Sequence, residues 1–312
     1  MTRGNESYTI VSLVRVDPLK KSILDSLTSA LNLIRFEANR PINNVVIKPN
    51  LCYYWHASTG YTTDPRVVGS LIDYLRRKFG NVSIKIAEAD ATAMRTAHSF
   101  KMLGYNELAE RKDVKLFNLS TDQIVEKRAT VSGKEIVLKV PSTLLDADLF
   151  INVPKLKTMK ATKISCALKN IFGCIASPRK VKYHPILNEA IVGINKILHP
   201  HLTIVDGIVG LGRFPAKLNL LISSTDPFST DWVAAKIMGY NPSRVGFLKI
   251  SKKEKLLSND IVVAGEKIEE FRRLFPSHSF IAAKKENLQI KFLRAYCRIT
   301  GDVLPPIMEY SE

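Results

Sequence analysis

The sequence predicts an α/β protein with a mostly parallel sheet, helices on both faces of the sheet, and a small basic C-terminal appendage. Strand-like apolar runs alternate with helical stretches as far as about Tyr240, which is the order expected for parallel strands joined by crossovers. Several of the runs, such as ADLFINVP at 147–154, are typical of strands buried on both faces. The 312 residues suffice for one large α/β domain or two smaller ones.

The first part of the chain supplies three of the expected strands and two of the helices. The strands are expected at 8–16, 43–50 and 82–90, and the helices at 18–38 and 65–79. The second helix is the better defined, because Asp64 can cap it, Pro65 suits its first turn and Gly80 can end it. Its buried stripe is expected to comprise Val67, Val68, Leu71, Ile72 and Leu75.

The later part of the chain continues the same alternation. Strands are expected at 114–119, 135–140, 147–154, 202–210 and 218–224, and helices at 185–198 and 228–238. Beyond this point the segments SKKEKLLSND, IVVAG and QIKFLRAYCRIT are more basic and less regular. We therefore expect an α/β core over residues 1–245 and a C-terminal extension packed on it over residues 246–312.

The formal net charge of +17 favours an anionic partner. Nucleic acid, an anionic membrane surface and a phosphorylated or carboxylated small molecule all fit such a charge. A basic, solvated surface is the plainer explanation, because most of the chain mixes both signs of charge. The segment from Leu149 to Asn188 is different, since it holds seven lysines and one arginine but no acid.

The sequence shows no signal for a secreted or membrane-spanning protein, and no local signal for a zinc or iron–sulfur site. The N-terminal region has only a short apolar run, interrupted by Arg15, and no window approaches the length of a membrane span, so we expect a cytoplasmic protein. The four cysteines form no C-x-x-C pair, which leaves zinc and iron–sulfur sites without a local signal. Cys166 and Cys174 are expected to be buried structural cysteines in preference to nucleophiles.

Polar side chains follow the expected buried strands. Because the carboxyl ends of parallel strands meet at one edge of a sheet, we expect these side chains to converge there. Each also has an ordinary interpretation as a turn residue, a helix cap or a solvated charge. The residues are Lys48, Asn50, Glu88, Asp90, Lys155, Lys157, Asp206, Asp226 and Asp231.

A Thr-Asp-Pro sequence occurs twice, each time between a strand and a helix. Asp64 and Asp226 are its central residues. Both can serve as helix N-caps. Alternatively, the two helix N-termini point into one crevice, where they would help to bind an anion.

The sequence resembles the domain of unknown function 362 family of archaea and bacteria in a set of short motifs. They are KPN, TTDP, PKLKT, LKNIFG, the later His184, DGIVG, and DPFSTD followed by KIMG. The resemblance covers roughly residues 43–245 and implies no settled reaction. Some members carry a ferredoxin-type module, whose cysteine run this stand-alone chain lacks. Met159 stands where many members have histidine after PKLKT. The recurring family positions are Lys48, Asn50, Asp64, Lys155, Lys157, Lys169, Asn170, Gly173, His184, Asp206, Asp226 and Asp231.

These residues predict a site with three kinds of role. Ammonium groups suit phosphate or carboxylate, an imidazole is a common general acid or base, and mutual repulsion among lysines would favour a basic or carbonyl-attacking amine. As catalytic residues we expect Lys155, Lys169, His184 and Asp231. As substrate-binding residues we expect Lys48, Asn50, Thr63, Asp64, Lys157, Asn170 and Arg179. As ligands of a divalent cation such as Mg²⁺ we expect Glu88, Asp206 and Asp226.

The favoured function is an enzyme that binds a small anionic substrate in a Lys/Asp-lined cleft. The first alternative is a nucleic-acid-binding protein that uses the basic 155–182 surface, with Phe172, Tyr183 and the aromatic run at 53–55 as stacking platforms. The second is an accessory protein related to metals or iron–sulfur clusters. Gly207, Gly210 and Gly212 form neither a P-loop nor a dinucleotide fingerprint, so no nucleotide cofactor is indicated.

Overall fold

The computed structural model describes residues 8–16, 22–38, 40–92, 94–177, 180–277 and 292. The chain divides into two compact units, residues 1–276 and 277–312, and the fold below is that of the first. This boundary comes later than residue 245, because the strand at 260–265 belongs to the main sheet. Within the described ranges, no helix is long and apolar enough to cross a membrane.

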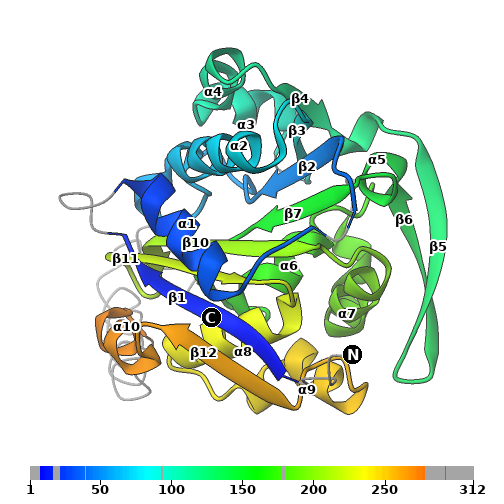
Figure 1. Cartoon of the computed structure of the whole chain (residues 1–312). Helices are drawn as coiled ribbons and strands as arrows, with labels where there is room; N and C mark the ends of the chain where they lie inside the picture. Colours follow the sequence, from blue (N-terminus) through cyan, green and yellow to red (C-terminus); the bar gives the residue numbers. More distant parts are fainter. Residues whose placement is uncertain are drawn as a thin grey trace, which may run out of the picture. The chain divides into compact units, whose positions relative to one another are not determined.

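The strands form one large sheet and one separate ribbon. The ribbon is β5–β6, which Figure 1 shows as a long pair at one side of the fold, beside α7. The strands are β1 (Tyr8–Arg15), β2 (Asn44–Pro49), β3 (Ser83–Glu88), β4 (Lys115–Asn118), β5 (Ile124–Val131), β6 (Lys134–Pro141), β7 (Leu149–Val153), β8 (Lys155–Met159), β9 (Lys163–Ser165), β10 (Leu202–Leu211), β11 (Pro215–Ser224) and β12 (Asp260–Gly265).

Most of the helices are short. The α-helices are α1 (Ile23–Leu33), α2 (Pro65–Phe79), α3 (Thr96–Met102), α4 (Tyr105–Arg111), α5 (Ser142–Leu145), α6 (Ala167–Phe172), α7 (Leu187–Ile197), α8 (Pro227–Ile237), α9 (Gly246–Lys253) and α10 (Ile268–Leu274). The 3₁₀ turns are η1 (Ala57–Thr59), η2 (Leu119–Thr121), η3 (Lys180–Ile186) and η4 (Pro242–Arg244).

The α/β class with a mostly parallel sheet is confirmed. Along the main path the strand order is β12-β1-β11-β10-β7-β2-β3-β4, with β8 and β9 branching from β10. Of the described strands on that path, β11 alone runs against its neighbours β1 and β10. The other neighbouring pairs are parallel.

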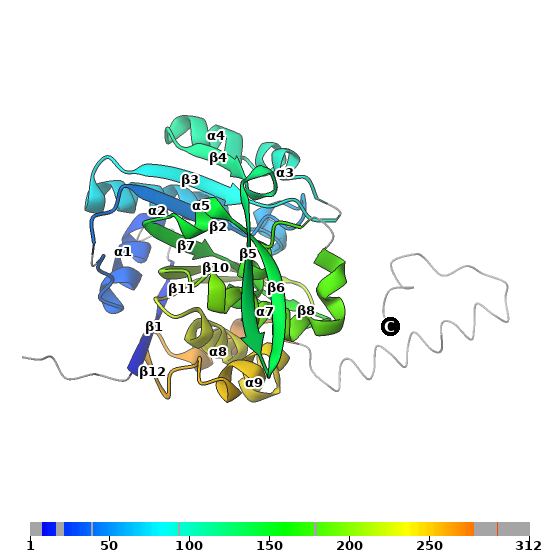
Figure 2. The same ribbon diagram turned by 90° about the vertical axis from the view of Figure 1, so that its right-hand side faces the viewer.

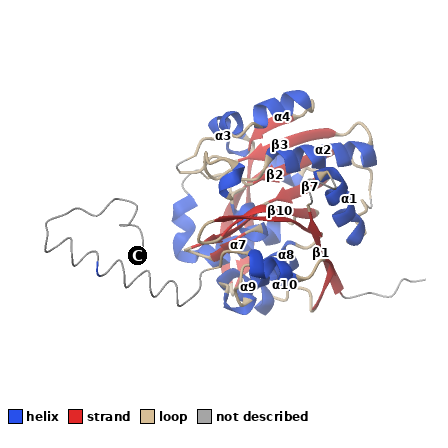
Figure 3. Ribbon diagram, turned by 90° about the vertical axis from the view of Figure 1, so that its left-hand side faces the viewer, coloured by secondary structure: helices blue, strands red, loops and turns tan. Residues whose placement is uncertain are grey.

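Helices cover both faces of the sheet, as expected. Val45 and Ile47 of β2 belong to the same hydrophobic cluster as Leu71 of α2, whereas Val46 belongs to the cluster that contains Ile191 of α7. Successive residues of a strand point to opposite faces, so the strand is buried from both sides. Figures 2 and 3 show the strands lying between these helices.

The helix α2 forms as its sequence predicts. Asp64 is the N-cap and accepts a hydrogen bond from Arg66 N, Pro65 occupies the first turn, and Gly80 ends the helix at a φ of 74°. The five apolar residues of the predicted stripe are all buried. Capping and burial therefore fix where this helix leaves β2.

The expectation that all strand ends meet at one edge is wrong for β11. Residues 212–214 alone connect β10 to β11, and a parallel crossover needs about a dozen residues or more. The two strands therefore form a hairpin, with Thr203 opposite Ser224. As a result, the carboxyl end of β11 lies at the edge where the parallel strands begin.

The strand order changes direction between β2 and β7. On one side of β2 the chain continues to β3 and β4, and on the other side lie β7 and β10. In open α/β sheets, ligands bind at the carboxyl ends of strands beside such a change of direction. The fold therefore predicts a ligand-binding site at the carboxyl ends of β2 and β7.

Candidate functional site

A cavity of about 290 Å³ lies at the carboxyl ends of β2 and β3. The loop after β2, the end of β8 and the helix α6 also contribute to it. Its described lining comprises Lys48, Asn50, Cys52, Tyr53, Glu88, Ala89, Ala91, Thr92, Met94, Lys157, Met159, Ser165, Lys169, Asn170, Phe172, Gly173, Lys180 and His184.

Lys48 and Glu88 form a buried ion pair in the cavity wall. The Lys48 ammonium lies 2.8 Å from Glu88 Oε1, and their side chains are 1% and 4% exposed. Lys48 Nζ also donates to the Pro49 carbonyl and to Asn170 Oδ1. Glu88 accepts from the backbone N–H groups of Leu51 and Ala89. Both charges are therefore held in place by β2, β3 and α6.

Asn170 connects the strands to α6. Its Oδ1 accepts from Asn50 Nδ2 at 3.0 Å, and its Nδ2 donates to Asn152 Oδ1 of β7 at 2.8 Å. Gly173 follows on the same turn, and a Cβ there would lie 3.3 Å from Lys48 Nζ and 2.9 Å from the Asn170 carbonyl oxygen. A side chain at this position would crowd the ion pair, which explains the glycine.

Lys157 is a second buried cation of the wall. Only 1% of the residue is exposed, and its ammonium donates to Asn50 Oδ1, to Cys52 Sγ and to the Tyr61 carbonyl at 2.8–2.9 Å. A lysine ammonium has three donor hydrogens. The described partners of Lys157 therefore match its donor capacity, as do those of Lys48.

Lys169 differs from these two lysines. No described residue forms a hydrogen bond or an ion pair with its ammonium, although the side chain lines the cavity. Burial lowers the pKa of Lys169, and repulsion from the nearby Lys157 lowers this pKa further. This lysine is thus a cation with free donors, facing a space that a ligand can enter.

Lys180 and His184 come from the turn before α7. Lys180 Nζ donates to the carbonyl oxygen of Asp90 at 2.8 Å, and burial lowers its pKa to about 8. His184 is exposed at the rim. Sequence reasoning named His184 but missed Lys180 as a site residue, because nothing in its local sequence shows that it reaches the loop after β3.

Lys155 and Asp206 form a second ion pair, outside the cavity. The Lys155 ammonium lies 2.7 Å from Asp206 Oδ2, and both side chains are 0% exposed. Asp206 also accepts from the backbone N–H groups of Asp64 and Ile208. Lys155 was expected to meet Lys169 in one anion cradle, but it does not line the cavity that Lys169 lines, and its pairing with Asp206 supports a structural role.

Thr63 and Asp64 also lie outside the cavity lining. Thr63 Oγ1 accepts from Asn50 N and donates to the Val153 carbonyl, which joins the loop after β2 to β7. Asp64 caps α2 and pairs with Arg66 at 2.6 Å. Hydrogen bonding with Arg66 outweighs burial and lowers the pKa of Asp64. Thr63 therefore holds Asn50 of the cavity wall in place, whereas Asp64 acts as a helix cap.

Asp226 and Asp231 do not join the cavity. Asp226 follows β11 at the opposite edge of the sheet and caps α8 by accepting from Phe228 N and Ser229 N. The idea that both Thr-Asp-Pro helix starts share one crevice is therefore wrong, and both residues are N-caps. Asp231 accepts from Ala167 N and Leu168 N at the start of α6, and burial raises its pKa to about 7.

The three carboxylates expected to bind a metal are not brought together. Glu88 pairs with Lys48, Asp206 pairs with Lys155, and Asp226 caps α8. The ranges that the structure describes contain no group of three or more histidine, cysteine or acidic side chains that could hold a metal ion. Arg179, expected to bind substrate, lies outside the described residues.

The cysteines divide into buried and cavity-lining residues. Burial raises the pKa of Cys166 well above its usual value and that of Cys174 to about 12, as suits structural cysteines. Cys52 is half-buried and lines the cavity, although sequence reasoning did not single it out. Cys297 lies outside the described residues.

The basic surface expected for nucleic acid is not formed by the motif lysines. Lys155 and Lys157 are each 1% exposed, so they cannot follow a phosphate backbone along the surface. Among the expected stacking residues, Tyr183 is buried, whereas Tyr53 and Phe172 line the cavity. The two lysines and Tyr183 are thus turned inward, whereas Tyr53 and Trp55 of the 53–55 run are 41% and 57% exposed.

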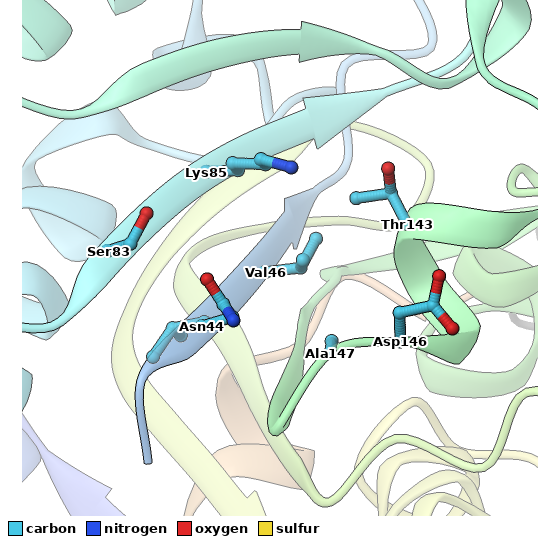
Figure 4. A pocket seen from close by; sticks show the side chains of 8 residues that line it. Asn44, Val46, Ser83, Lys85, Thr143, Asp146 and Ala147 are labelled. Carbon is cyan, nitrogen blue, oxygen red and sulfur yellow. The ribbon is translucent and has the colours of Figure 1, made fainter.

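A second cavity, shown in Figure 4, lies at the other end of the strands. Its volume is about 190 Å³, and it includes Asn44 and Ser83, the first residues of β2 and β3. Lys85 and Asp146 are the charged groups in its described lining. Because these two charges balance, this cavity is a weaker candidate than the first for binding a charged ligand.

Comparisons with known proteins show the family of this chain and its similarity to a curated protein and to solved structures. The family described as Domain of unknown function (DUF362) matches residues 45–236. The Thylakoid-associated protein sll1697 of Synechocystis sp. is 28% identical over 251 residues, which are 75% of this chain and 76% of that protein.

One of the similar solved structures is the lactate racemase apoprotein from Thermoanaerobacterium thermosaccharolyticum. It aligns with a TM-score of 0.48 and 13% identity, over 76% of this chain and 59% of the other. The aligned region thus spans less than two thirds of that protein's length.

Proposed function

The chain belongs to the DUF362 family of domains of unknown function, and the matched residues 45–236 include the cavity lining. From the charge of this cavity, we propose that the protein is an enzyme acting on a small phosphorylated or carboxylated substrate. The substrate binds in the cavity at the carboxyl ends of β2 and β3. Its negative charge meets Lys169 and Lys180, while Lys48, Lys157 and the amides of Asn50 and Asn170 form the fixed wall behind them.

The charge of the cavity carries this proposal. Its described lining holds four lysines and one carboxylate, a formal excess of three positive charges. That carboxylate, Glu88, is already engaged by Lys48 and two backbone N–H groups. Burying a cation without a counter-charge is costly. A dianionic or trianionic group would offset the excess.

Proton transfer is the chemistry that the lining residues favour. Lys169 combines free donors with a lowered pKa, so the amine form needed for a base or a carbonyl-attacking nucleophile is more accessible than in a solvated lysine. His184 is at the exposed rim, where an imidazole can exchange protons with solvent. Lys169 thus has two roles, binding the anion when charged and reacting when neutral.

The Lys169→Ala variant should bind sulfate about tenfold or more weakly than the wild type, because a charge-assisted hydrogen bond contributes about 1.5–3 kcal/mol. Lys169→Arg should stay within about threefold, since it restores the charge and the donors. Isothermal titration calorimetry measures both affinities. Lys249→Ala removes an exposed lysine away from the cavity and is the matched control. Equal sulfate affinity in the alanine variant and the wild type would place the anion elsewhere.

Sulfate affinity should fall as pH rises through about 8, because Lys180 is charged below its pKa of about 8 and neutral above it. Sulfate is the suitable probe, since its own charge is constant over this range. The charges that face Lys180 are Glu88, Lys48 and Asp90, with Cys174 neutral at these pH values. Titrations between pH 6 and pH 9 test the prediction. In Lys180→Arg the sulfate affinity should be nearly constant through pH 8. If the affinity of this variant instead falls with pH as it does in the wild type, Lys180 is not the titrating group.

A further inference from the structure

The cavity also has an apolar and aromatic lining. Beside the lysines lie the side chains of Tyr53, Met94, Met159 and Phe172. A site for inorganic phosphate alone has no use for these groups, because a small hydrated anion gains nothing from apolar contacts. The lining fits an anion that carries an apolar body.

Three aromatic rings of the loop after β2 form an array, and one of them, Tyr53, lines the cavity. The Trp55 and Tyr61 rings stack at 5.9 Å and 30°, and the Tyr53 ring meets Tyr61 edge-on at 5.7 Å. Lys157 Nζ lies 5.9 Å from the Tyr61 ring centroid, which connects the array to the cationic wall. Tyr53 is 41% exposed and Trp55 57% exposed, so both rings keep surface free for a further partner.

The loop that carries these rings is held in a defined conformation. Thr62 Oγ1 donates to the Trp55 carbonyl at 2.6 Å, and His56 caps the following turn. Gly60 has a φ of 75°, and a Cβ there would lie 2.9 Å from Leu211 Cβ. The aromatic rings are therefore presented by an anchored loop, a preorganised arrangement that lowers the entropic cost of binding.

We propose that the substrate is an anion carrying a single planar ring, namely a phosphomonoester or carboxylate of an aromatic or heteroaromatic molecule, whose ring stacks on Tyr53 while its charge meets Lys169. This inference rests on the proposed function. The volume of about 290 Å³ lies at the lower end of small-molecule sites. It suits one ring and one anionic group better than a dinucleotide.

The Tyr53 hydroxyl is compatible with such a ligand. Burial raises the pKa of Tyr53, and so does the proximity of Cys52 and Tyr61. The phenol therefore stays neutral near pH 7 and does not repel an anion. Aromatic stacking between the ring faces is tolerant of ring chemistry, which is why the class includes heteroaromatic rings.

Calorimetry with matched pairs of small anions tests this inference. Phenyl phosphate should bind the wild type about tenfold more tightly than methyl phosphate, and benzoate should show the same preference over acetate if the anion is a carboxylate. Tyr53→Ala should lose most of this preference and leave methyl phosphate or acetate within about twofold. Tyr53→Phe should keep it, because the ring remains. Phe214→Ala, which removes an exposed ring outside the described cavity lining, is the control.

The possible results separate this inference from the proposed function. If phenyl and methyl phosphate bind equally and both weaken in Lys169→Ala, the anion site stands and the aromatic specificity is wrong. A preference that survives in Tyr53→Ala also overturns the assignment of the ring to Tyr53. If none of the four anions binds the wild type, both proposals fail. Thermal unfolding of each variant confirms that it is folded before titration.

Discussion

Replacing Asp206 with alanine is expected to lower the free energy of unfolding by about 3–5 kcal/mol, because it leaves the Lys155 ammonium buried without its counter-charge. Both side chains of this pair are 0% exposed. The variant also removes the acceptor of the Asp64 and Ile208 backbone N–H groups, whose loss adds to the cost. Urea denaturation followed by circular dichroism measures the change.

The double variant Lys155→Met/Asp206→Leu provides the internal control. Replacing both members of a buried ion pair by apolar residues is often nearly neutral, so the part of the loss that comes from the unpaired Lys155 ammonium should return. The cost of leaving the Asp64 and Ile208 N–H groups without an acceptor should remain. Glu135→Ala breaks the exposed pair with Arg128 and should change stability little. A loss below about 1 kcal/mol in Asp206→Ala would contradict the expected cost of leaving Lys155 buried without a counter-charge.

Much of the fold follows from local sequence. The apolar runs predict β2, β3, β7 and β10, and α2 is fixed by its cap, its first-turn proline and its apolar stripe. The direction of β11 could have been predicted from the three-residue connection at 212–214, which is too short for a crossover. The strands β8 and β9 could not, because their charged sequence resembles a loop until the buried partners of Lys155 and Lys157 are known.

The candidate site was predictable at the carboxyl ends of β2 and β3. Lys48 and Glu88 lie at the carboxyl ends of β2 and β3 and Asn50 directly follows β2, and the structure brings them together with Lys169 and Asn170. Residue spacing alone could not show that neighbouring lysines have different partners. Lys155 and Lys157 are two residues apart, yet the first pairs with Asp206 and the second with amide, thiol and carbonyl groups.

Glu88→Gln is expected to destabilise the protein and to tighten anion binding at the same time. Glutamine keeps the shape of the side chain. However, its NH₂ group would face another donor, either the Leu51 N–H or the Lys48 ammonium. Lys48 also loses its counter-charge. We expect a loss of about 3 kcal/mol without ligand. Because the cavity gains one net positive charge, sulfate should bind about tenfold more tightly, which corresponds to about 1.4 kcal/mol.

Thermal and urea unfolding with increasing sulfate test both effects in one variant. A ligand that binds only the folded state stabilises it by about 2.7 kcal/mol at a hundredfold excess over its Kd, so sulfate should recover more stability in Glu88→Gln than in the wild type. Asp206→Ala should show no such extra recovery, because its unpaired lysine is outside the cavity. Titration with Mg²⁺ tests the alternative that Glu88 binds a metal ion instead of serving only as the counter-charge of Lys48. If Mg²⁺ stabilises the wild type and fails to stabilise Glu88→Gln, then Glu88 is a metal ligand and its pairing with Lys48 is the metal-free arrangement of the site.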